Sequence, residues 1–138
     1  MKCLLSGDET AGQFCLFENR RGGNTRTPIH AHARDDETVY IIDGELTAMV
    51  GGRPQRLPAG QSIFLPRGLP HQLENISGTP VRYILIGTSA VFDRFVTEGG
   101  RLLQPDEVVG RPTPQDLERL SKVAPRFGIT LLPKWPAP

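Results

Sequence analysis

Cysteine is scarce in this sequence, and long apolar runs are absent. Cys3 and Cys15 are the two cysteines among 138 residues, which is too few for a disulfide framework. The simplest interpretation is a soluble protein of a reducing compartment, and we expect a cytoplasmic location. No stretch reaches the roughly 18 apolar residues of a membrane span. The apolar run near Met1 is also too short for a secretory signal, so we expect no membrane partner.

An excess of charge of either sign is also lacking. The chain has 16 Lys and Arg residues against 15 Asp and Glu residues. The densest basic stretch, around Arg20 and Arg21, lies among turn residues, and we interpret it as a solvated loop. Because nucleic-acid-binding domains usually concentrate positive charge on one face, we expect no nucleic-acid partner. No helix-turn-helix segment is found either, which disfavours a one-component transcriptional regulator.

Turn-forming residues, in contrast, are abundant and evenly spread. The chain has 15 Gly and 13 Pro. From residue 12 to residue 87 they separate short β-rich runs at intervals of about 8–12 residues, a spacing typical of an all-β barrel or sandwich. The pair Asp43-Gly44 joins two of these runs and predicts a β-hairpin. The run over residues 13–19 is a candidate edge strand.

The pattern changes from strands to helices after residue 88. An apolar stripe that includes Phe92 and Phe95 predicts one helix, with Ser89 as its N-cap and residues 99–100 as its end. These two rings either cap a barrel mouth or form plain core. We therefore expect a β-barrel over residues 1–88 and a short, mostly helical extension over residues 89–138, packed on the barrel within a single domain.

A second helix is expected further along this extension. Thr113 is a suitable N-cap, Pro114 fits the first helical position, and Asp116 follows three residues after the cap. Pro125 is expected to end or kink this helix. Residues 129–133 then predict a last short strand.

Histidine is rare, yet two of the three histidines are two residues apart. In a strand, His30 and His32 would point to the same face and could bind one metal ion. Glu37 lies five residues after His32, so it reaches that face only if the chain bends within residues 33–36. His71 would join them only if the sheet closes on itself. Taken singly, each of these residues is more often an ordinary surface or core residue.

Two spaced motifs resemble those of the cupin family. The first is glycine, H-x-H, glutamate and glycine, which here are Gly23, His30, His32, Glu37 and Gly44. The second is glycine, P-x-G, histidine and asparagine, which here are Gly60, Pro66, Gly68, His71 and Asn75. The sequence departs from the pattern by one extra residue after Gly23, where a loop tolerates an insertion. All three histidines fall on the positions of the family's metal ligands.

The resemblance implies an all-β fold, an antiparallel jelly-roll barrel. It also implies one divalent transition metal ion per chain, held by His30, His32, Glu37 and His71. Three neutral imidazoles and one carboxylate suit iron, manganese, nickel, zinc or cobalt, and a six-coordinate ion would keep open positions for substrate. We expect Asn75 to have a structural role in hydrogen bonding, with support of the metal site as the alternative.

Three functions are compatible with such a protein, because cupins are functionally diverse, and of these we expect a metal-dependent dioxygenase-type oxidoreductase. Small cupins with the complete ligand set resemble quercetin-type dioxygenases, in which the substrate chelates the metal. In that interpretation Glu37 is catalytic, either as a ligand or as a general base. The alternatives are a non-redox isomerase, lyase or polyketide cyclase with the metal as Lewis acid, and a non-catalytic cupin that binds a small ligand.

The expected partners are a small-molecule substrate and a second copy of the chain, because single-domain cupins commonly form homodimers. We expect the substrate to be aromatic or oxygen-rich rather than strongly anionic, since no Arg or Lys lies beside the ligands within a strand. The apolar residues expected in the barrel interior are Phe14, Val39, Ile41, Met49, Phe64, Tyr83 and Leu85.

Overall fold

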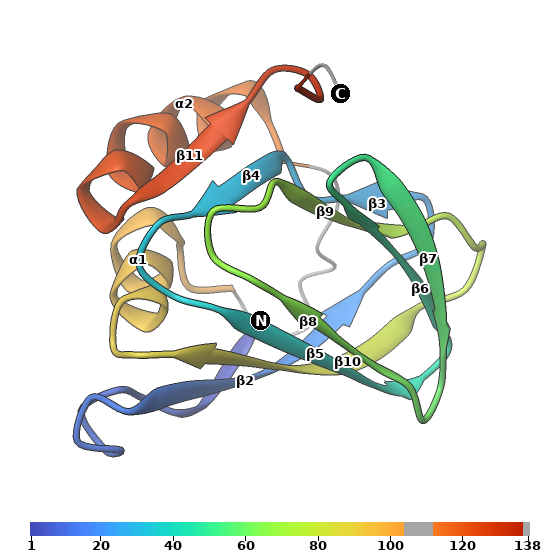
Figure 1. The fold of residues 1–138 in the computed structure, drawn as a ribbon, viewed down its shortest axis with the longest axis horizontal. Coiled ribbons are helices and arrows are strands. Elements are labelled where there is room, and N and C mark those ends of the chain that lie inside the picture. The colour runs from blue at the N-terminus through green and yellow to red at the C-terminus, as the bar shows by residue number, and fades with distance from the viewer. Residues whose placement is uncertain (104–111, 137–138) are drawn as a thin grey trace.

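Two antiparallel sheets form the two walls of a jelly-roll barrel in the computed structural model, which describes residues 1–103 and 112–136 (Figure 1). The first sheet has the order β1 (Lys2–Leu5), β2 (Phe14–Arg21), β10 (Val81–Thr88), β5 (Glu37–Asp43) and β8 (Ser62–Leu65). The second has the order β11 (Ile129–Leu132), β4 (Ile29–His32), β9 (His71–Asn75), β6 (Glu45–Val50) and β7 (Arg53–Pro58), with β3 (Thr25–Arg26) beside β9. The predicted fold class is confirmed.

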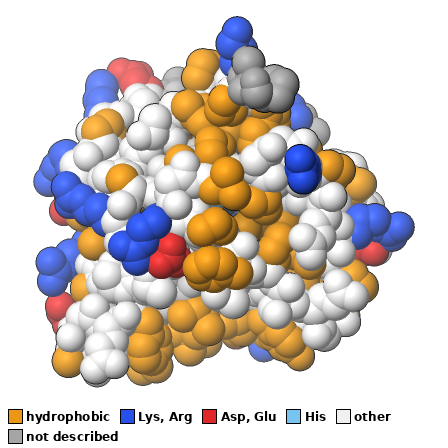
Figure 2. Space-filling view, viewed as in Figure 1, with side chains coloured by type: hydrophobic (Ala, Val, Ile, Leu, Met, Phe, Trp, Pro, Cys, Tyr) orange, Lys and Arg blue, Asp and Glu red, His pale blue; other side chains and the backbone are white. Residues whose placement is uncertain are grey.

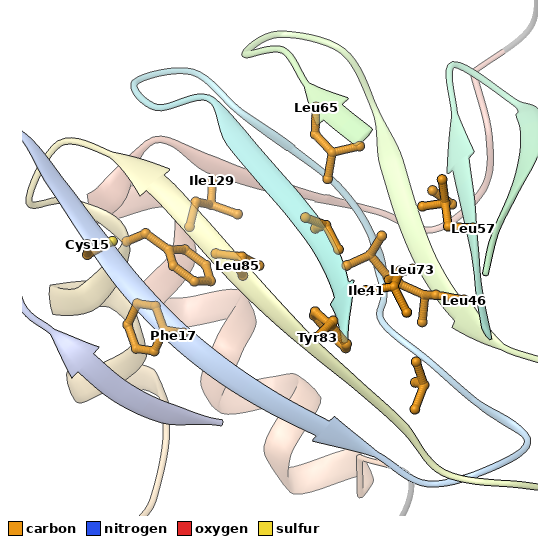
Figure 3. Packing of buried hydrophobic residues seen from close by; sticks show 14 of the residues in the cluster. Cys15, Phe17, Ile41, Leu46, Leu57, Leu65, Leu73, Tyr83, Leu85 and Ile129 are labelled. Atoms are coloured by element: carbon orange, nitrogen blue, oxygen red, sulfur yellow. The ribbon is translucent and has the colours of Figure 1, made fainter. Parts of the chain in front are cut away.

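Alternating apolar side chains fill the space between the sheets. Along β10, Val81, Tyr83 and Leu85 are buried while the residues between them are more exposed. Figure 3 shows Ile41, Leu46, Leu73 and Tyr83 grouped between strands of the two sheets. Burial of each large apolar side chain stabilises the fold by about 1.5–3 kcal/mol.

The predicted interior residues are partly correct. Four of the seven are buried in the core: Val39, Ile41, Tyr83 and Leu85. Phe64 is 58% exposed, so its predicted interior position is wrong. The reason is the alternation along β8, in which Ile63 and Leu65 face the core and Phe64 faces away. Phe14 and Met49 are half-buried.

The turn at Asp43-Gly44 does not form the predicted hairpin. It joins β5 of the first sheet to β6 of the second, and the two strands are not paired with each other. Gly44 has φ of 80°, and a Cβ atom there would lie 2.9 Å from the carbonyl oxygen of Pro80. The turn residues are therefore suited to a sharp reversal of the chain. The two strands still pair with other strands, because each buries its apolar face in a different wall of the barrel.

The predicted edge strand is also wrong. β2 lies between β1 and β10, with Cys3 opposite Phe17 on one side and Leu85 opposite Phe17 on the other. The edge of this sheet is β1. Strand propensity does not distinguish an edge strand from a central strand. That position depends on which other segments pair with the strand.

Helix α1 (Phe92–Gly99) lies at one end of the barrel (Figure 1). It begins after Val91 without a side-chain cap, so the predicted N-cap at Ser89 is wrong. Ser89 has φ of 89°, outside the extended conformation of an N-cap, because the chain turns sharply there after β10. The buried carboxylate of Asp93 accepts a hydrogen bond from the backbone of Gly7 (2.8 Å) and joins the helix to the N-terminal loop.

Helix α2 (Pro114–Val123) starts as predicted. The Thr113 hydroxyl accepts from the Asp116 backbone (3.1 Å), and the Asp116 carboxylate accepts from the Thr113 backbone (2.9 Å). The helix ends before Pro125, which lies in the single turn η1 (Ala124–Phe127). Neither helix of the described residues is long and apolar enough to cross a membrane.

The predicted last strand is β11, and it pairs with β4. Ile129 lies opposite His32, and Leu131 lies opposite His30. The described part of residues 89–138 therefore adds a strand to the second sheet as well as two helices. The expected boundary at residue 88 stays a prediction.

Candidate metal centre

The four predicted metal ligands lie together inside the barrel. His30, His32, Glu37 and His71 each offer one ligand atom, and these atoms all lie within 4.8 Å of one another. Glu37, His32 and His71 are buried, and His30 is half-buried. This cluster could hold a metal ion.

Strand pairing places the three imidazoles. His30 on β4 lies directly opposite His71 on β9, and their ring centroids are 4.4 Å apart. His32 follows His30 by two residues on the same strand face, with its ring centroid 5.5 Å from that of His71. Two residues of one strand and one of its neighbour thus form three sides of the cluster.

Glu37 reaches the histidines from the opposite wall. It is the first residue of β5, in the first sheet, so the bend expected within residues 33–36 is a loop that crosses between the sheets. Its Oε2 lies 3.3 Å from His71 Nε2, and its Oε1 lies 3.9 Å from His32 Nε2. On one continuous strand, Glu37 would face away from His32, because the two are five residues apart. The crossing to the other sheet lets it face the histidines.

Each imidazole is held through its Nδ1 atom. His30 Nδ1 is 2.9 Å from the Pro28 carbonyl, and His71 Nδ1 is 3.1 Å from the Leu69 carbonyl. A carbonyl oxygen only accepts, so Nδ1 donates in both cases and Nε2 is left without a proton when the ring is neutral. The bare Nε2 atoms are therefore the ones available to a metal.

His32 is oriented by a carboxylate instead. Its Nδ1 donates to Asp35 Oδ2 over 2.9 Å. The Nε2 atoms of His32 and His71 are buried and have no hydrogen-bond partner within residues 1–103 and 112–136. Buried polar atoms are usually satisfied, and a metal ion would satisfy both of these at once. The donor set therefore fits a divalent transition metal.

Electrostatics favour ligand-ready protonation states at two of the four residues. Burial, together with the nearby His71, lowers the pKa of His30 to about 4. Burial alone would raise the pKa of Glu37, but the adjacent His71, His32 and His30 outweigh it and lower that pKa below its ordinary value. At neutral pH His30 is thus neutral and Glu37 is a carboxylate.

His32 behaves differently. Burial alone would lower its pKa, but the hydrogen bond to Asp35 and the charges of Glu37 and Asp35 raise it above the ordinary value. Metal binding at His32 therefore has to remove a proton that this ring holds more tightly than an ordinary histidine does.

An aromatic cluster lies against one side of the centre. The Phe92 ring, at the start of α1, is 5.6 Å from the His32 ring and 5.5 Å from Phe17. Phe92 is 6% exposed, and Phe95 packs behind it at 6.0 Å. Of the two alternatives for these rings, plain core holds, since Phe92 belongs to the buried hydrophobic cluster and Phe95 packs against it.

The sequence did not reveal the different roles of the two aspartates in the crossing loop. Asp36 binds Arg67, with Oδ2 2.7 Å from Nη2. Asp35 is buried and binds His32. A carboxylate three residues after a ligand histidine is the only signal that pointed to this contact. Asn75 has the expected structural role: it is buried and donates to the backbone carbonyls of Arg21, Gly22 and Thr79.

A cavity of about 850 Å³ lies outside the barrel wall that carries the histidines. Ile29 and Gln72 line it, and each is next in sequence to a cluster histidine and so points to the other face of its strand. None of the four cluster residues lines this cavity. The metal centre and the external cavity are therefore on opposite sides of one sheet.

Comparison with known proteins agrees with this architecture. The chain is 34% identical over 55 residues to the tetracenomycin polyketide synthase protein TcmJ of Streptomyces glaucescens. The matched segment covers 40% of this chain and 37% of that protein. The chain is also 28% identical over 92 residues to the HTH-type transcriptional regulator PuuR of Escherichia coli strain K12. This match covers 67% of this chain and 49% of the regulator. The chain thus spans less than half the length of either relative.

A solved structure shares the same fold. The polyketide cyclase RemF from Streptomyces resistomycificus superposes with a TM-score of 0.57 at 27% sequence identity, over 64% of this chain and 62% of that one. Residues 17–87 match the family model of the cupin domain, and both spaced motifs, which run from Gly23 to Asn75, fall within this range. With its two-walled barrel and its cluster of three histidines and one glutamate, the chain belongs to the cupin family.

Proposed function

We propose that this protein is a metal-dependent cupin enzyme that holds one divalent ion of iron, manganese, nickel, zinc or cobalt. The ligands are His30, His32, Glu37 and His71. The observation that carries the proposal is the pair of buried Nε2 atoms, of His32 and His71, that have no partner in the described residues and face a carboxylate. Such an arrangement costs stability unless a cation completes it.

The substrate class follows from the surroundings of the centre. Phe92 supplies aromatic surface beside His32 and packs on Phe17, and no lysine or arginine is among the four clustered residues. We infer a small aromatic or oxygen-rich substrate that chelates the ion through its own oxygen atoms. Similarity to TcmJ and RemF supports a polyketide-like compound.

The reaction best supported is a non-redox rearrangement, such as cyclisation. A bound divalent ion would supply Lewis acidity to a substrate carbonyl. Glu37 is the residue of this chain suited to accept a proton from the substrate, because its lowered pKa keeps it ionised at neutral pH. The neutral imidazoles of the cluster would hold the ion without adding charge.

A dioxygenase is the second candidate, and the donor set itself favours it. Three imidazoles and one carboxylate leave open positions on a six-coordinate ion, where substrate and dioxygen could both bind. In this alternative Glu37 accepts the proton of a substrate hydroxyl. The same four residues serve both reactions, so the two differ in their need for dioxygen.

One experiment separates these alternatives. Protein reconstituted with iron, nickel, manganese, zinc or cobalt is incubated with flavonols, catechols, diketones and linear polyketide analogues, in air and under nitrogen. Turnover under nitrogen supports the Lewis-acid enzyme, and oxygen uptake that stops under nitrogen supports the dioxygenase. Metal binding with tight substrate binding but no turnover would make the protein a ligand-binding cupin. Absence of bound metal would contradict both enzymatic functions.

Two broader expectations remain predictions. We propose that the protein acts as a homodimer and that it resides in the cytoplasm. The latter is supported by Cys3 and Cys15, which are both free thiols.

A further inference from the structure

Asp35 has an unusual hydrogen-bonding environment for a loop aspartate. It is 1% exposed, and its one hydrogen bond with the described residues runs from His32 Nδ1 to Oδ2 over 2.9 Å. Its other oxygen, Oδ1, is buried and has no partner within the described chain. A buried carboxylate oxygen without a partner destabilises a fold. This carboxylate therefore needs an explanation other than ordinary loop structure.

Other groups hold the loop in place. Backbone hydrogen bonds fix it on both sides: Ala33 N to Gly128 O (2.8 Å), Gly68 N to His32 O (2.6 Å) and Thr88 N to Asp36 O (2.9 Å). The Asp36 carboxylate accepts from the backbone N of Arg67 (2.8 Å) and from its guanidinium (2.7 Å). Asp36 thus anchors the loop, whereas the Asp35 carboxylate, among the described residues, accepts a hydrogen bond only from His32.

We propose that Asp35 is a positioning residue for the metal centre, which fixes the orientation of the His32 ring and the proton on its Nδ1 atom. The inference rests on the proposed metal-binding function. With Nδ1 donating to Asp35, the Nε2 atom of His32 is turned toward Glu37, 3.9 Å away. Carboxylates that accept from the far nitrogen of a ligand histidine also make that ligand a stronger donor.

Asp35 has a second effect, on the charge of the centre. Glu37 and Asp35 place two carboxylates on opposite sides of the His32 ring, and both are almost fully buried. Two carboxylates with three neutral imidazoles balance the charge of one divalent ion. Balance matters in a barrel interior, where an uncompensated charge is strongly unfavourable.

The test compares Asp35→Asn and Asp35→Ala with Asp36→Asn as the matched control. Asparagine keeps the size and one acceptor oxygen of Asp35 but removes its charge, whereas alanine removes both. Dissociation constants for Zn²⁺ and Co²⁺ are measured by competition with a chromophoric chelator. The Co²⁺ absorption spectrum reports the ligand geometry. Thermal unfolding of each metal-free variant shows whether it is folded.

We expect both Asp35 variants to weaken metal binding by about 10–100-fold, with alanine at the upper end. The Co²⁺ spectrum should change in the same variants, and Asp36→Asn should leave both readouts close to those of the wild type. The metal-free Asp35→Asn protein should unfold at or above the wild-type temperature, because a neutral amide replaces a buried carboxylate whose Oδ1 has no partner in the described residues.

The outcomes distinguish the inference from the function on which it rests. If the wild type binds metal and both Asp35 variants bind it equally tightly, the role of Asp35 is overturned and the metal site stands. Unchanged affinity with a lower unfolding temperature of the metal-free variants would assign Asp35 to loop structure instead. A wild-type chain that binds neither ion overturns both proposals.

Discussion

The orientation of each imidazole decides what the three histidines can do. Their Nδ1 atoms are occupied by the carbonyls of Pro28 and Leu69 and by the Asp35 carboxylate, so their Nε2 atoms face the centre. An imidazole binds a metal only when that nitrogen carries no proton. The behaviour of the centre in acid and on loss of one ring therefore follows from single residues.

Metal affinity should fall as the pH falls. The pKa of His32 is raised and that of His30 is lowered, so His32 gains a proton before His30 when a solution is acidified from pH 8. Below that pKa a protonated His32 must lose its proton to bind metal, so the affinity should drop by about tenfold per pH unit. Dissociation constants for Zn²⁺ at pH 8, 7, 6 and 5 check this. Constant affinity over this range would contradict a site built on His32.

Removal of one ring should empty the centre. We expect His71→Ala to lose most of the bound metal, because it removes the imidazole that links β9 to the two rings of β4. Metal content per chain is measured by mass spectrometry after reconstitution and dialysis. Glu74→Gln, on the same strand but on its other face, is the matched control and should bind as the wild type does. Equal metal content in the two variants would refute the proposed ligand set.

At the scale of elements, helix α1 closes the barrel beside the centre. Phe92 joins the helix to the core through Phe17 and His32, and Phe95 continues the contact outward. The helix is eight residues long, which is too short to be stable by itself. Its position therefore depends on these aromatic contacts and on Asp93, which binds Gly7.

Truncation of Phe92 should destabilise the fold markedly. We expect Phe92→Ala to lower the free energy of unfolding by about 3–5 kcal/mol, because a buried ring would leave a cavity between the barrel and α1. Urea denaturation measures this change. Leu117→Ala, at a site that is 41% exposed on α2, should change the unfolding free energy by less than about 1 kcal/mol. Similar effects of the two substitutions would show that α1 is loosely attached.

The elements also show where sequence-based prediction succeeds and where it fails. The spacing of His30, His32, Glu37 and His71 identified side chains that lie together, because motif spacing reflects strand alternation and loop length. The cap at Thr113 was predictable because its partner is three residues away. Partners distant in the sequence were not predictable. The strands joined at Gly44 separate into two sheets, and only its spacing from His32 distinguishes Asp35 from Asp36 in the sequence.

At the scale of the whole molecule, the outer face of the first sheet carries several exposed or half-buried apolar side chains. Tyr40 is 46% exposed and Phe64 is 58% exposed. Ile84 is paired with Tyr40, and Ile86 is paired with Thr38, which also lies opposite Phe64. Figure 2, drawn in the same view as Figure 1, shows a band of hydrophobic side chains down the middle of the face toward the viewer. Continuous exposed apolar surface of this kind is typical of protein interfaces.

We expect this face to form the homodimer. Light scattering should give twice the chain mass of 15.2 kDa for the wild type, and Phe64→Glu should shift the protein toward the monomer, because it places a charge in an apolar interface. Ile76→Glu is the matched control, since Ile76 is 65% exposed in the turn after β9. A wild type that is monomeric at micromolar concentration, or a Phe64→Glu variant that stays dimeric, would exclude this interface.

The pairing of β11 with β4 has a consequence for the order of events during synthesis. Two of the proposed ligands lie on β4, and that strand acquires its second neighbour only when Ile129–Leu132 pairs with it. A nascent chain that has exposed the three histidines but not β11 still has an open edge beside them. We therefore expect the ion to be held firmly only after β11 has paired with β4.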